Sequence, residues 1–197
     1  ATLAAGKVKE AAAAIESLQK QGARRLILDL RNTAVGAADQ GVALANLFVS
    51  SGTLAYLQGQ RVPRQNFDAE AGRAMSSLPL AVLVNRGTAD GAEIAAAALL
   101  EHKRAEVVGE RTYGDAALRR PVTLEDGSAV ILSVAKYYSP NGKAIQDTGV
   151  TPGTLVAEVE AQVELDENGE AVPQSEPEPQ TLDDPILKKA IEGIRNR

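Results

Sequence analysis

Hydrophobic residues in this chain occur in two patterns, helical spacing and short continuous runs. Lys7–Gln21 carries its apolar residues at helical spacing and is followed by Gly22, which predicts a helix with a glycine stop. Arg25–Leu30 and Leu80–Asn85 are short apolar runs, typical of strands that are buried on both faces of a sheet. The same patterns predict helices and strands in turn over Val42–Val49 (helix), Thr53–Gln58 (strand), Asp90–His102 (helix) and Glu106–Gly109 (strand).

The C-terminal half adds a hairpin and a last helix. Pro121–Leu124 and Ala129–Tyr137 flank the turn sequence Glu125–Ser128, which indicates two antiparallel strands. Arg61–Asn66 is polar and is expected to be a loop, whereas Ile186–Arg195 has the apolar stripe of an amphipathic helix. The pattern predicts an α/β fold with a mixed β-sheet flanked by helices, an appended antiparallel hairpin and a C-terminal helix.

The charges are unevenly distributed. The chain has 21 Lys and Arg against 26 Asp and Glu, yet residues 158–184 hold ten of the acids and no base. Pro173, Pro177 and Pro179 lie in the same stretch, which favours an extended linker. We therefore divide the chain into a core (1–157), an acidic, Pro-containing connector (158–182) and a C-terminal amphipathic helix (183–197). The near-neutral core is unlike a nucleic-acid-binding surface, which needs a dense basic face.

Several kinds of chemistry are excluded by composition. The chain has no Cys and one His, so it offers no disulfide, no cysteine nucleophile and no histidine-rich metal centre. We expect no cofactor and no bound metal. The longest apolar stretches, such as Leu80–Val84 and Ile94–Leu100, are much shorter than the roughly 20 residues of a membrane-spanning helix.

Six separated phrases resemble the core of the carboxyl-terminal processing, or tail-specific, serine peptidases. They are Leu26-Ile-Leu-Asp-Leu-Arg-Asn32, Val82-Leu-Val-Asn85 with Gly87-Thr-Ala89, Val107-Val-Gly-Glu-Arg-Thr-Tyr-Gly114, Asp126-Gly-Ser128, Tyr137-Tyr-Ser-Pro-Asn-Gly142 and Gly149-Val-Thr-Pro152. The resemblance runs from about residue 7 to 155 and again at Asp184–Arg195. It implies a ClpP/crotonase-like fold, an extracytoplasmic (periplasmic or secreted) setting, an upstream PDZ domain and a first core strand that precedes this chain.

The resemblance also implies a serine nucleophile, a lysine general base and a glutamine that orients the lysine. At the three corresponding positions this chain has Asp90, Asp115 and Arg119. The loop that helps to form the oxyanion hole in the family reads Thr33-Ala-Val-Gly36 and keeps only the last glycine. We therefore expect a degenerate, proteolytically inactive member of the family, in which Gly36 and the amide of Gly91 remain as a partial anion-binding nest.

The acids at these positions have several explanations. Asp90 and Glu93 have the spacing of a capping box at a helix start. Arg119 or Arg120 could neutralise Asp115 in an ion pair. Two less favoured alternatives are an aspartate dyad that holds a water and a hard-cation site made by Asp90, Asp115 and Glu93.

Other polar residues are expected to be structural. His102 ends a predicted helix, where a cation suits the free carbonyls. Ser139 and Lys143 flank a Pro-Asn-Gly turn and are not expected to form a substitute catalytic pair.

Three functions remain. The first is a peptide-binding or assembly module that receives an extended peptide or a protein C-terminus. The second is an active serine-type endopeptidase that processes protein C-termini. The third is a carrier of small apolar ligands, because the modules of interphotoreceptor retinoid-binding proteins resemble the same core; four Tyr, two Phe and no Trp leave little aromatic surface for such a pocket.

Overall fold

A four-stranded parallel sheet forms the centre of the molecule. The structure is a computed structural model that describes residues 1–158 and 184–195. The strand order is β10-β7-β6-β2, and every neighbouring pair is parallel, so all carboxyl ends lie at one edge. The strands are β2 (Leu26–Asp29), β6 (Leu80–Val84), β7 (Glu106–Gly109) and β10 (Thr154–Leu155).

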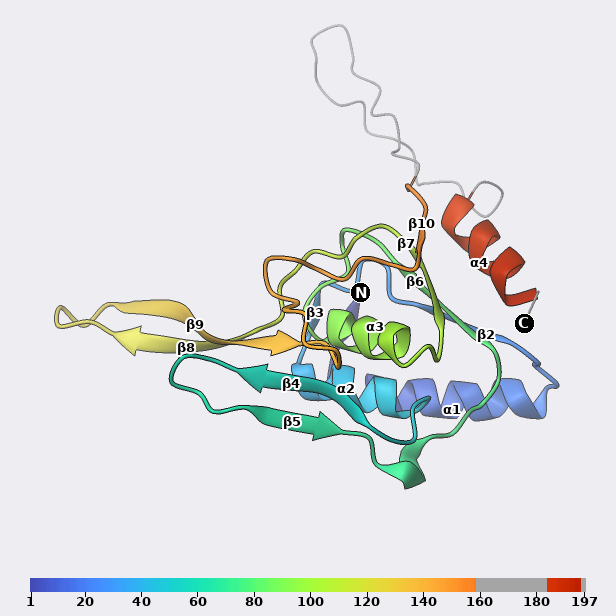
Figure 1. The fold of residues 1–197 in the computed structure, drawn as a ribbon, viewed down its shortest axis with the longest axis horizontal. Helices are drawn as coiled ribbons and strands as arrows, with labels where there is room; N and C mark the ends of the chain where they lie inside the picture. Colours follow the sequence, from blue (N-terminus) through green and yellow to red (C-terminus); the bar gives the residue numbers. More distant parts are fainter. Residues whose placement is uncertain (159–183, 196–197) are drawn as a thin grey trace, which may run out of the picture.

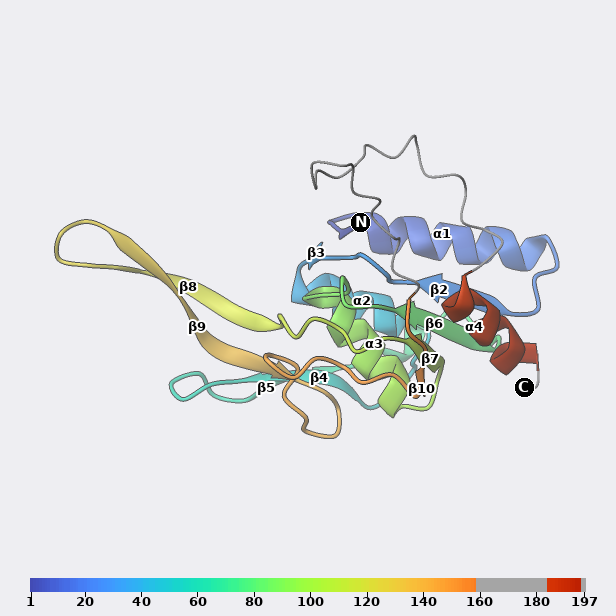
Figure 2. The ribbon, with the colours of Figure 1, turned by 90° about the horizontal axis from the view of Figure 1, so that it is seen from above.

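Helices cover both faces of this sheet (Figures 1 and 2). On one face, α1 (Lys7–Lys20), α2 (Ala38–Asn46) and α3 (Gly91–Glu101) pack their apolar residues against Leu80, Val82, Val84 and Val107. On the other face, α4 (Pro185–Arg195) buries Ile186, Ala190 and Ile194 against Ala81, Leu83 and Val108. Alternate residues of β6 therefore point to opposite layers, as expected of a strand that is buried on both faces.

A second, antiparallel sheet lies beside α3. Its order is β5-β4-β9-β8, made by β4 (Thr53–Gln58), β5 (Gln65–Asp68), β8 (Ala117–Thr123) and β9 (Ala129–Tyr138). An apolar cluster that includes Ala55, Ile94 and Ala116 joins this sheet to α3. The β8–β9 hairpin projects away from the body of the molecule, beyond the tip of the β4–β5 hairpin (Figures 1 and 2).

Three short elements complete the described chain. β1 (Thr2–Leu3) and β3 (Val35–Gly36) form a small parallel pair, and η1 (Ala71–Arg73) is a single 3₁₀ turn. In the described residues, no helix is long and apolar enough to span a membrane.

The predicted α/β class, the hairpin and the C-terminal helix are confirmed, with corrections to individual elements. The mixed sheet is in fact two separate sheets, one parallel and one antiparallel. The predicted loop Arg61–Asn66 runs into a strand, because Gln65–Asp68 pairs with β4 although its residues are mostly polar. The predicted helix Val42–Val49 lies instead at Ala38–Asn46; its last apolar residues are buried in a turn after the helix. The predicted connector lies outside the described residues, except for Glu158.

Candidate functional site

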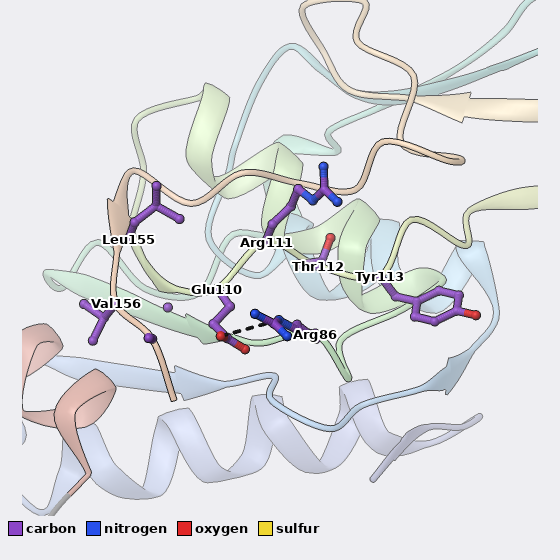
Figure 3. Close-up of a pocket in the computed structure, with 9 residues that line it drawn as sticks. Arg86, Glu110, Arg111, Thr112, Tyr113, Leu155 and Val156 are labelled. Atoms are coloured by element: carbon purple, nitrogen blue, oxygen red, sulfur yellow. Dashed lines mark ion pairs between the residues drawn. The ribbon is translucent and has the colours of Figure 1, made fainter. Parts of the chain in front are cut away.

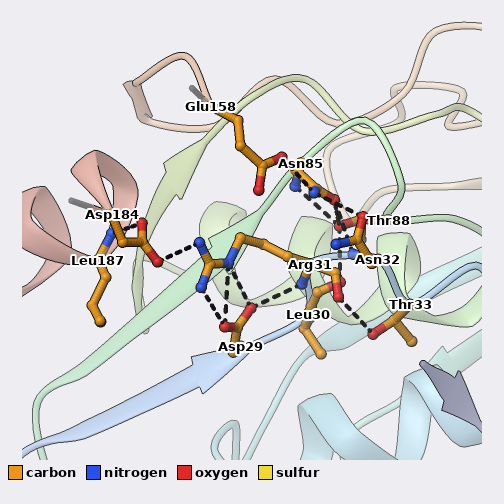
Figure 4. A network of polar contacts seen from close by, with 10 residues as sticks. All are labelled: Asp29, Leu30, Arg31, Asn32, Thr33, Asn85, Thr88, Glu158, Asp184 and Leu187. Carbon is orange, nitrogen blue, oxygen red and sulfur yellow. Dashed lines mark hydrogen bonds and ion pairs between the residues drawn. The ribbon is translucent and has the colours of Figure 1, made fainter. Parts of the chain in front are cut away.

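The side chain of Asn85 joins the loops that follow β2 and β6 (Figure 4). Asn85 is buried, and its amide oxygen accepts the N–H groups of Asn32 at 2.9 Å and of Gly87 at 3.0 Å. Its amide nitrogen donates to the Asn32 side chain at 3.0 Å. The Thr88 hydroxyl donates to the Leu30 carbonyl at 2.9 Å, so the two loops are held together by side chains as well as by the sheet.

Arg31 extends this network to the C-terminal helix (Figure 4). Its guanidinium contacts Asp29 and Asp184 at 2.7 Å each. Asp184 in turn accepts the Leu187 N–H at 2.9 Å at the start of α4. Desolvation opposes ionisation of Asp184, but the bonds from Leu187 and Arg31 outweigh it and lower the pKa of the carboxyl group. Glu158 also accepts from the Asn85 amide at 2.8 Å, so both described flanks of the 159–183 segment meet this network.

Asp90 lies in a strained turn between β6 and α3. Its backbone has φ 54° and ψ −125°, a conformation that residues other than glycine rarely adopt. A Cβ on the next residue, Gly91, would lie 2.5 Å from the Ala37 carbonyl, so this turn packs backbone against backbone with the Gly36–Ala37 loop. Strand–turn–helix positions of this kind expose nucleophiles in other α/β enzymes. The chain thus presents an aspartate at a position that is shaped for a reactive side chain.

Glu93 fixes the second half of the site. The residue is fully buried, and its carboxylate accepts the N–H groups of Gly114 and Asp115 at 2.7 Å each and the Thr112 hydroxyl. It also accepts the Asp90 N–H at 3.1 Å, and the predicted capping box of Asp90 and Glu93 is present. One carboxylate therefore positions both the start of α3 and the loop that carries Asp115. Burial raises the pKa of Glu93, and these four donors oppose the shift.

The pKa of Asp90 is raised well above the ordinary value of an aspartate. Burial, then the nearby charge of Asp115, raises the pKa of Asp90 to about 6; Arg119 and a hydrogen bond from the Gly36 N–H act in the opposite direction. Burial and then the charge of Asp90 also raise the pKa of Tyr137, which places this phenol near the same carboxylate.

Asp115 forms an ion pair with a base four residues later in the chain. Arg119 forms an ion pair with the Asp115 carboxylate, and both side chains are about one-third exposed, at 38% and 35%. The predicted ion pair is therefore made by Arg119 rather than by Arg120. Arg119 thus holds the Asp115 carboxylate, and among the causes that raise the pKa of Asp90 burial comes before the charge of Asp115.

A cation site is not supported here. Glu93 already receives four donors, which leaves its oxygens poorly placed to bind a metal ion. Over residues 1–158 and 184–195, no three His, Cys, Asp or Glu side chains are grouped closely enough to hold a metal.

The remaining polar candidates have structural partners. The His102 ring bonds to the Thr53 carbonyl at 2.9 Å and thereby joins the end of α3 to β4. The Ser139 hydroxyl donates to Glu101 at 2.9 Å and accepts the main-chain N–H of Lys143 at 3.1 Å. Ser139 and Lys143 therefore make a turn and not a hydroxyl–amine pair.

A crevice of about 660 Å³ opens at the carboxyl ends of β6 and β7 (Figure 3). Arg86 and Glu110 form an ion pair at its floor, with N···O 3.5 Å, and Tyr113 lies at its other end, 71% exposed. Asp90 and Asp115 are not among its lining residues, although the Tyr113 N–H bonds to Thr88, two residues before Asp90. Crevices at this edge of a parallel sheet are common ligand sites.

Sequence reasoning identified Asp90, Asp115, Arg119, Gly36 and Gly91 but missed two organising residues. The sequence identifies Asn85 only as the end of a strand phrase, and Glu93 as half of a capping box and as a member of a possible cation site. A buried Asn after a strand and a buried Glu in an otherwise apolar helix are the signals that could have found them, because such groups need several hydrogen-bond partners.

Comparison with known proteins gives one consistent answer. Residues 3–156 match the family described as peptidase family S41. A carboxyl-terminal-processing protease from Synechocystis is 38% identical over 152 residues, which are 77% of this chain and 35% of that protein. The carboxy-terminal processing protease CtpA of Bacillus subtilis is 38% identical over 145 residues, which are 73% of this chain and 31% of that protein.

A solved structure agrees with both relatives. The photosystem II D1 C-terminal processing protease superposes with a TM-score of 0.73 at 38% identity, over 80% of this chain and 41% of that chain. This chain thus spans about a third of the length of the curated relatives it matches. By sequence match and by fold, the chain belongs to peptidase family S41.

Proposed function

We propose that this domain is a proteolytically silent member of its family that binds an extended peptide or the C-terminus of a protein. The proposal rests on the side chains at two positions, the one where the family resemblance expects the nucleophile and the one where it expects the general base. Asp90 occupies the strained turn where the family resemblance expects a serine, and Asp115 occupies the expected lysine position, already paired with Arg119. A carboxylate has no hydroxyl group to attack a peptide carbonyl as serine does, and the Asp115 carboxylate at the expected lysine position is held by Arg119, whose guanidinium stays protonated.

The state of the anion-binding amide supports the same proposal. Acyl-transfer enzymes need free N–H donors where the oxyanion develops. Here the Gly36 N–H acts on the Asp90 carboxylate and lowers its pKa. The internal carboxylate thus competes with any substrate oxygen for that donor.

An active peptidase is the second candidate, and the names of the relatives favour it. Residues 78–127 contain no serine, and the position expected for the nucleophile holds Asp90. Asp90, with its pKa raised to about 6, could then accept a proton from an attacking water near neutral pH. This mechanism requires Asp90 itself, which makes it easy to separate from the silent alternative.

The carrier of apolar ligands receives less support. The cavity beside Ala97, Leu100 and Ile145 is about 220 Å³, and small-molecule pockets usually span about 300–1,000 Å³. The larger crevice is bordered by charged side chains, Arg86 and Glu110 among them.

For the whole protein we propose an extracytoplasmic setting and an upstream PDZ domain. Both rest on the family resemblance; some of the relatives are named as chloroplastic. The three-part division into a core, an acidic connector and a C-terminal helix is part of the same proposal.

The test is to restore the expected chemistry. The triple variant Asp90→Ser, Asp115→Lys and Arg119→Gln is incubated with an unfolded protein such as casein, beside the wild type and the single variant Asp90→Ser. We expect no cleavage by the wild type or the single variant, and measurable cleavage by the triple variant. Cleavage by the wild type that Asp90→Ser abolishes would instead establish the aspartate mechanism.

A further inference from the structure

The outer half of β9 has one backbone edge without a strand partner. β4 pairs with β9 only from Tyr56↔Tyr138 to Gln58↔Lys136. The chain then turns away at Gly59, whose N–H bonds to the Val62 carbonyl at 3.0 Å. Within the described residues, Ala129–Ala135 therefore has β8 on one side and no strand on the other.

The register tells which backbone groups face the free edge. Ile131 lies opposite Pro121 in the β8–β9 ladder. Since Pro121 has no N–H to donate, this pair fits the antiparallel position at which N–H and C=O groups point away from the partner strand. By the two-residue period of a strand, Ala129, Ile131 and Ser133 then direct their N–H and C=O groups to the free edge. Pro121 likewise interrupts the outer edge of β8, the end strand of this sheet.

A groove with a basic lining borders the inner end of this edge, at Leu132–Lys136. It has a volume of about 760 Å³ and lies between the β9 backbone and the turn that follows β4. Its charged lining residues are Arg61 and Lys136, and no acid lines it. Lys136 is paired with Asp147 at 2.7 Å, whereas Arg61 is exposed and forms no ion pair with another described residue.

The hairpin also exposes apolar side chains around this edge. Ile131 is 70% exposed, Leu132 46% and Val130 41%. A two-stranded ribbon is only marginally stable in water, and an open edge flanked by apolar residues invites an added strand. An extended peptide that begins in this groove and continues along Ser133, Ile131 and Ala129 would cover both features.

We propose that the free edge of β9 binds an extended acidic peptide as an added strand, with its backbone paired to Ala129, Ile131 and Ser133 and its acids near Arg61 and Lys136. The inference rests on the proposed peptide-binding function and names the edge and the charge that select the peptide. Main-chain pairing supplies affinity in this mode, and the side chains supply selectivity.

The first experiment uses fluorescein-labelled (Glu-Val)4-amide as the probe and (Lys-Val)4-amide as its matched control, followed by fluorescence anisotropy. We expect the acidic probe to bind at least about tenfold more tightly than the basic one, and Arg61→Glu to weaken binding by about tenfold. Ile131→Pro removes an outward N–H and adds bulk at the edge, so we expect it to abolish binding. Ile131→Val serves as the matched control and keeps the affinity.

A second version of the probe separates strand addition from simple charge attraction. Two acidic peptides carry N-methyl groups on alternate residues, one on the Glu positions and one on the Val positions. Because only one set of N–H groups faces β9, we expect one peptide to lose binding and the other to bind within about threefold of the parent. Equal binding by both methylated peptides would overturn the inference.

Failure of this inference differs from failure of the proposed function. If both peptides bind the wild type and Ile131→Pro equally, peptide binding stands but the β9 edge is wrong. If neither peptide binds while unfolded casein does, the acidic added strand is likewise excluded and the general function stands. Dimers of the wild type that Ile131→Pro disperses would show that a second copy occupies the edge, which would also overturn the proposal.

Discussion

The Glu93 carboxylate accepts the main-chain N–H of Asp115 at 2.7 Å, so a side chain at the start of α3 fixes the loop that carries the opposite half of the site. The same buried carboxylate holds Thr112 and Gly114. The geometry of the site therefore depends on a residue that does not itself face the crevice.

Glu93→Gln tests this relationship. The amide nitrogen of Gln would face N–H donors, so we expect a loss of about 1–3 kcal/mol in the free energy of unfolding. Urea denaturation of the variant measures it, with Glu10→Gln on the exposed face of α1 as the control. A change no larger than that of the control would show that the loop is held by other contacts.

Asp90→Asn tests the environment of Asp90. Because the folded-state pKa is raised from 3.8 to about 6, the folded chain binds this proton more tightly than the unfolded chain. The contribution of Asp90 to stability is then most favourable below pH 3.8 and falls as the pH rises through about 6. The amide does not ionise, and Asn also caps helices well.

We therefore expect the stability of Asp90→Asn relative to the wild type to increase between pH 4 and pH 7, by about 1 kcal/mol after allowance for partial exposure. Denaturation at several pH values measures this difference, with the exposed Asp39→Asn as the control. A pH-independent difference would contradict the proposed burial of the Asp90 charge.

Arg31→Lys tests the link between the site loops and α4. Arg31 bridges Asp29 and Asp184 with a planar fork that an ammonium group cannot reproduce. We expect a loss of about 1–2 kcal/mol and faster hydrogen exchange in α4. In a double-mutant cycle, Asp184→Asn should cost less when Arg31 is already Lys. Strictly additive effects would mean that the two residues act independently.

Gly41→Ala tests the close approach of α2 to the Asp90 turn. In an open helix the change would stabilise by about 1 kcal/mol. At position 41 the new Cβ would overlap the Gly91 carbonyl, so we expect destabilisation by about 1–3 kcal/mol. The matched control is Gly72→Ala, where nothing lies within 4 Å of the added carbon. Thermal unfolding that ranks the two variants in the opposite order would contradict the packing.

The sequence was informative where local pattern determines structure. The run Leu80–Val84 and the helix after Asp90 follow from apolar spacing, and the Asp90–Glu93 capping box follows from residue types at fixed spacing. The strand Gln65–Asp68 could not be predicted, because its polar residues join a sheet only through pairing with a distant strand. The roles of Glu93 and Asn85 were equally hidden, since the partners that join them to other loops lie 19 to 73 residues away.

The candidate site, like the fold, could be predicted from the sequence only in part. The family resemblance identified Asp90, Asp115 and Arg119 as the residues at the three catalytic positions. The Asp115–Arg119 ion pair was expected from their charges. The strained turn at Asp90 and the close packing of Gly91 against the Gly36–Ala37 loop depend on how two loops pack, which residue spacing does not specify.

The most direct test of the central claim is the rate at which the purified wild type hydrolyses a fluorogenic unfolded substrate, measured beside Asp90→Ala. Our account predicts that both proteins give the rate of buffer alone. A wild-type rate well above buffer that falls to background in Asp90→Ala would contradict it and make Asp90 a catalytic residue.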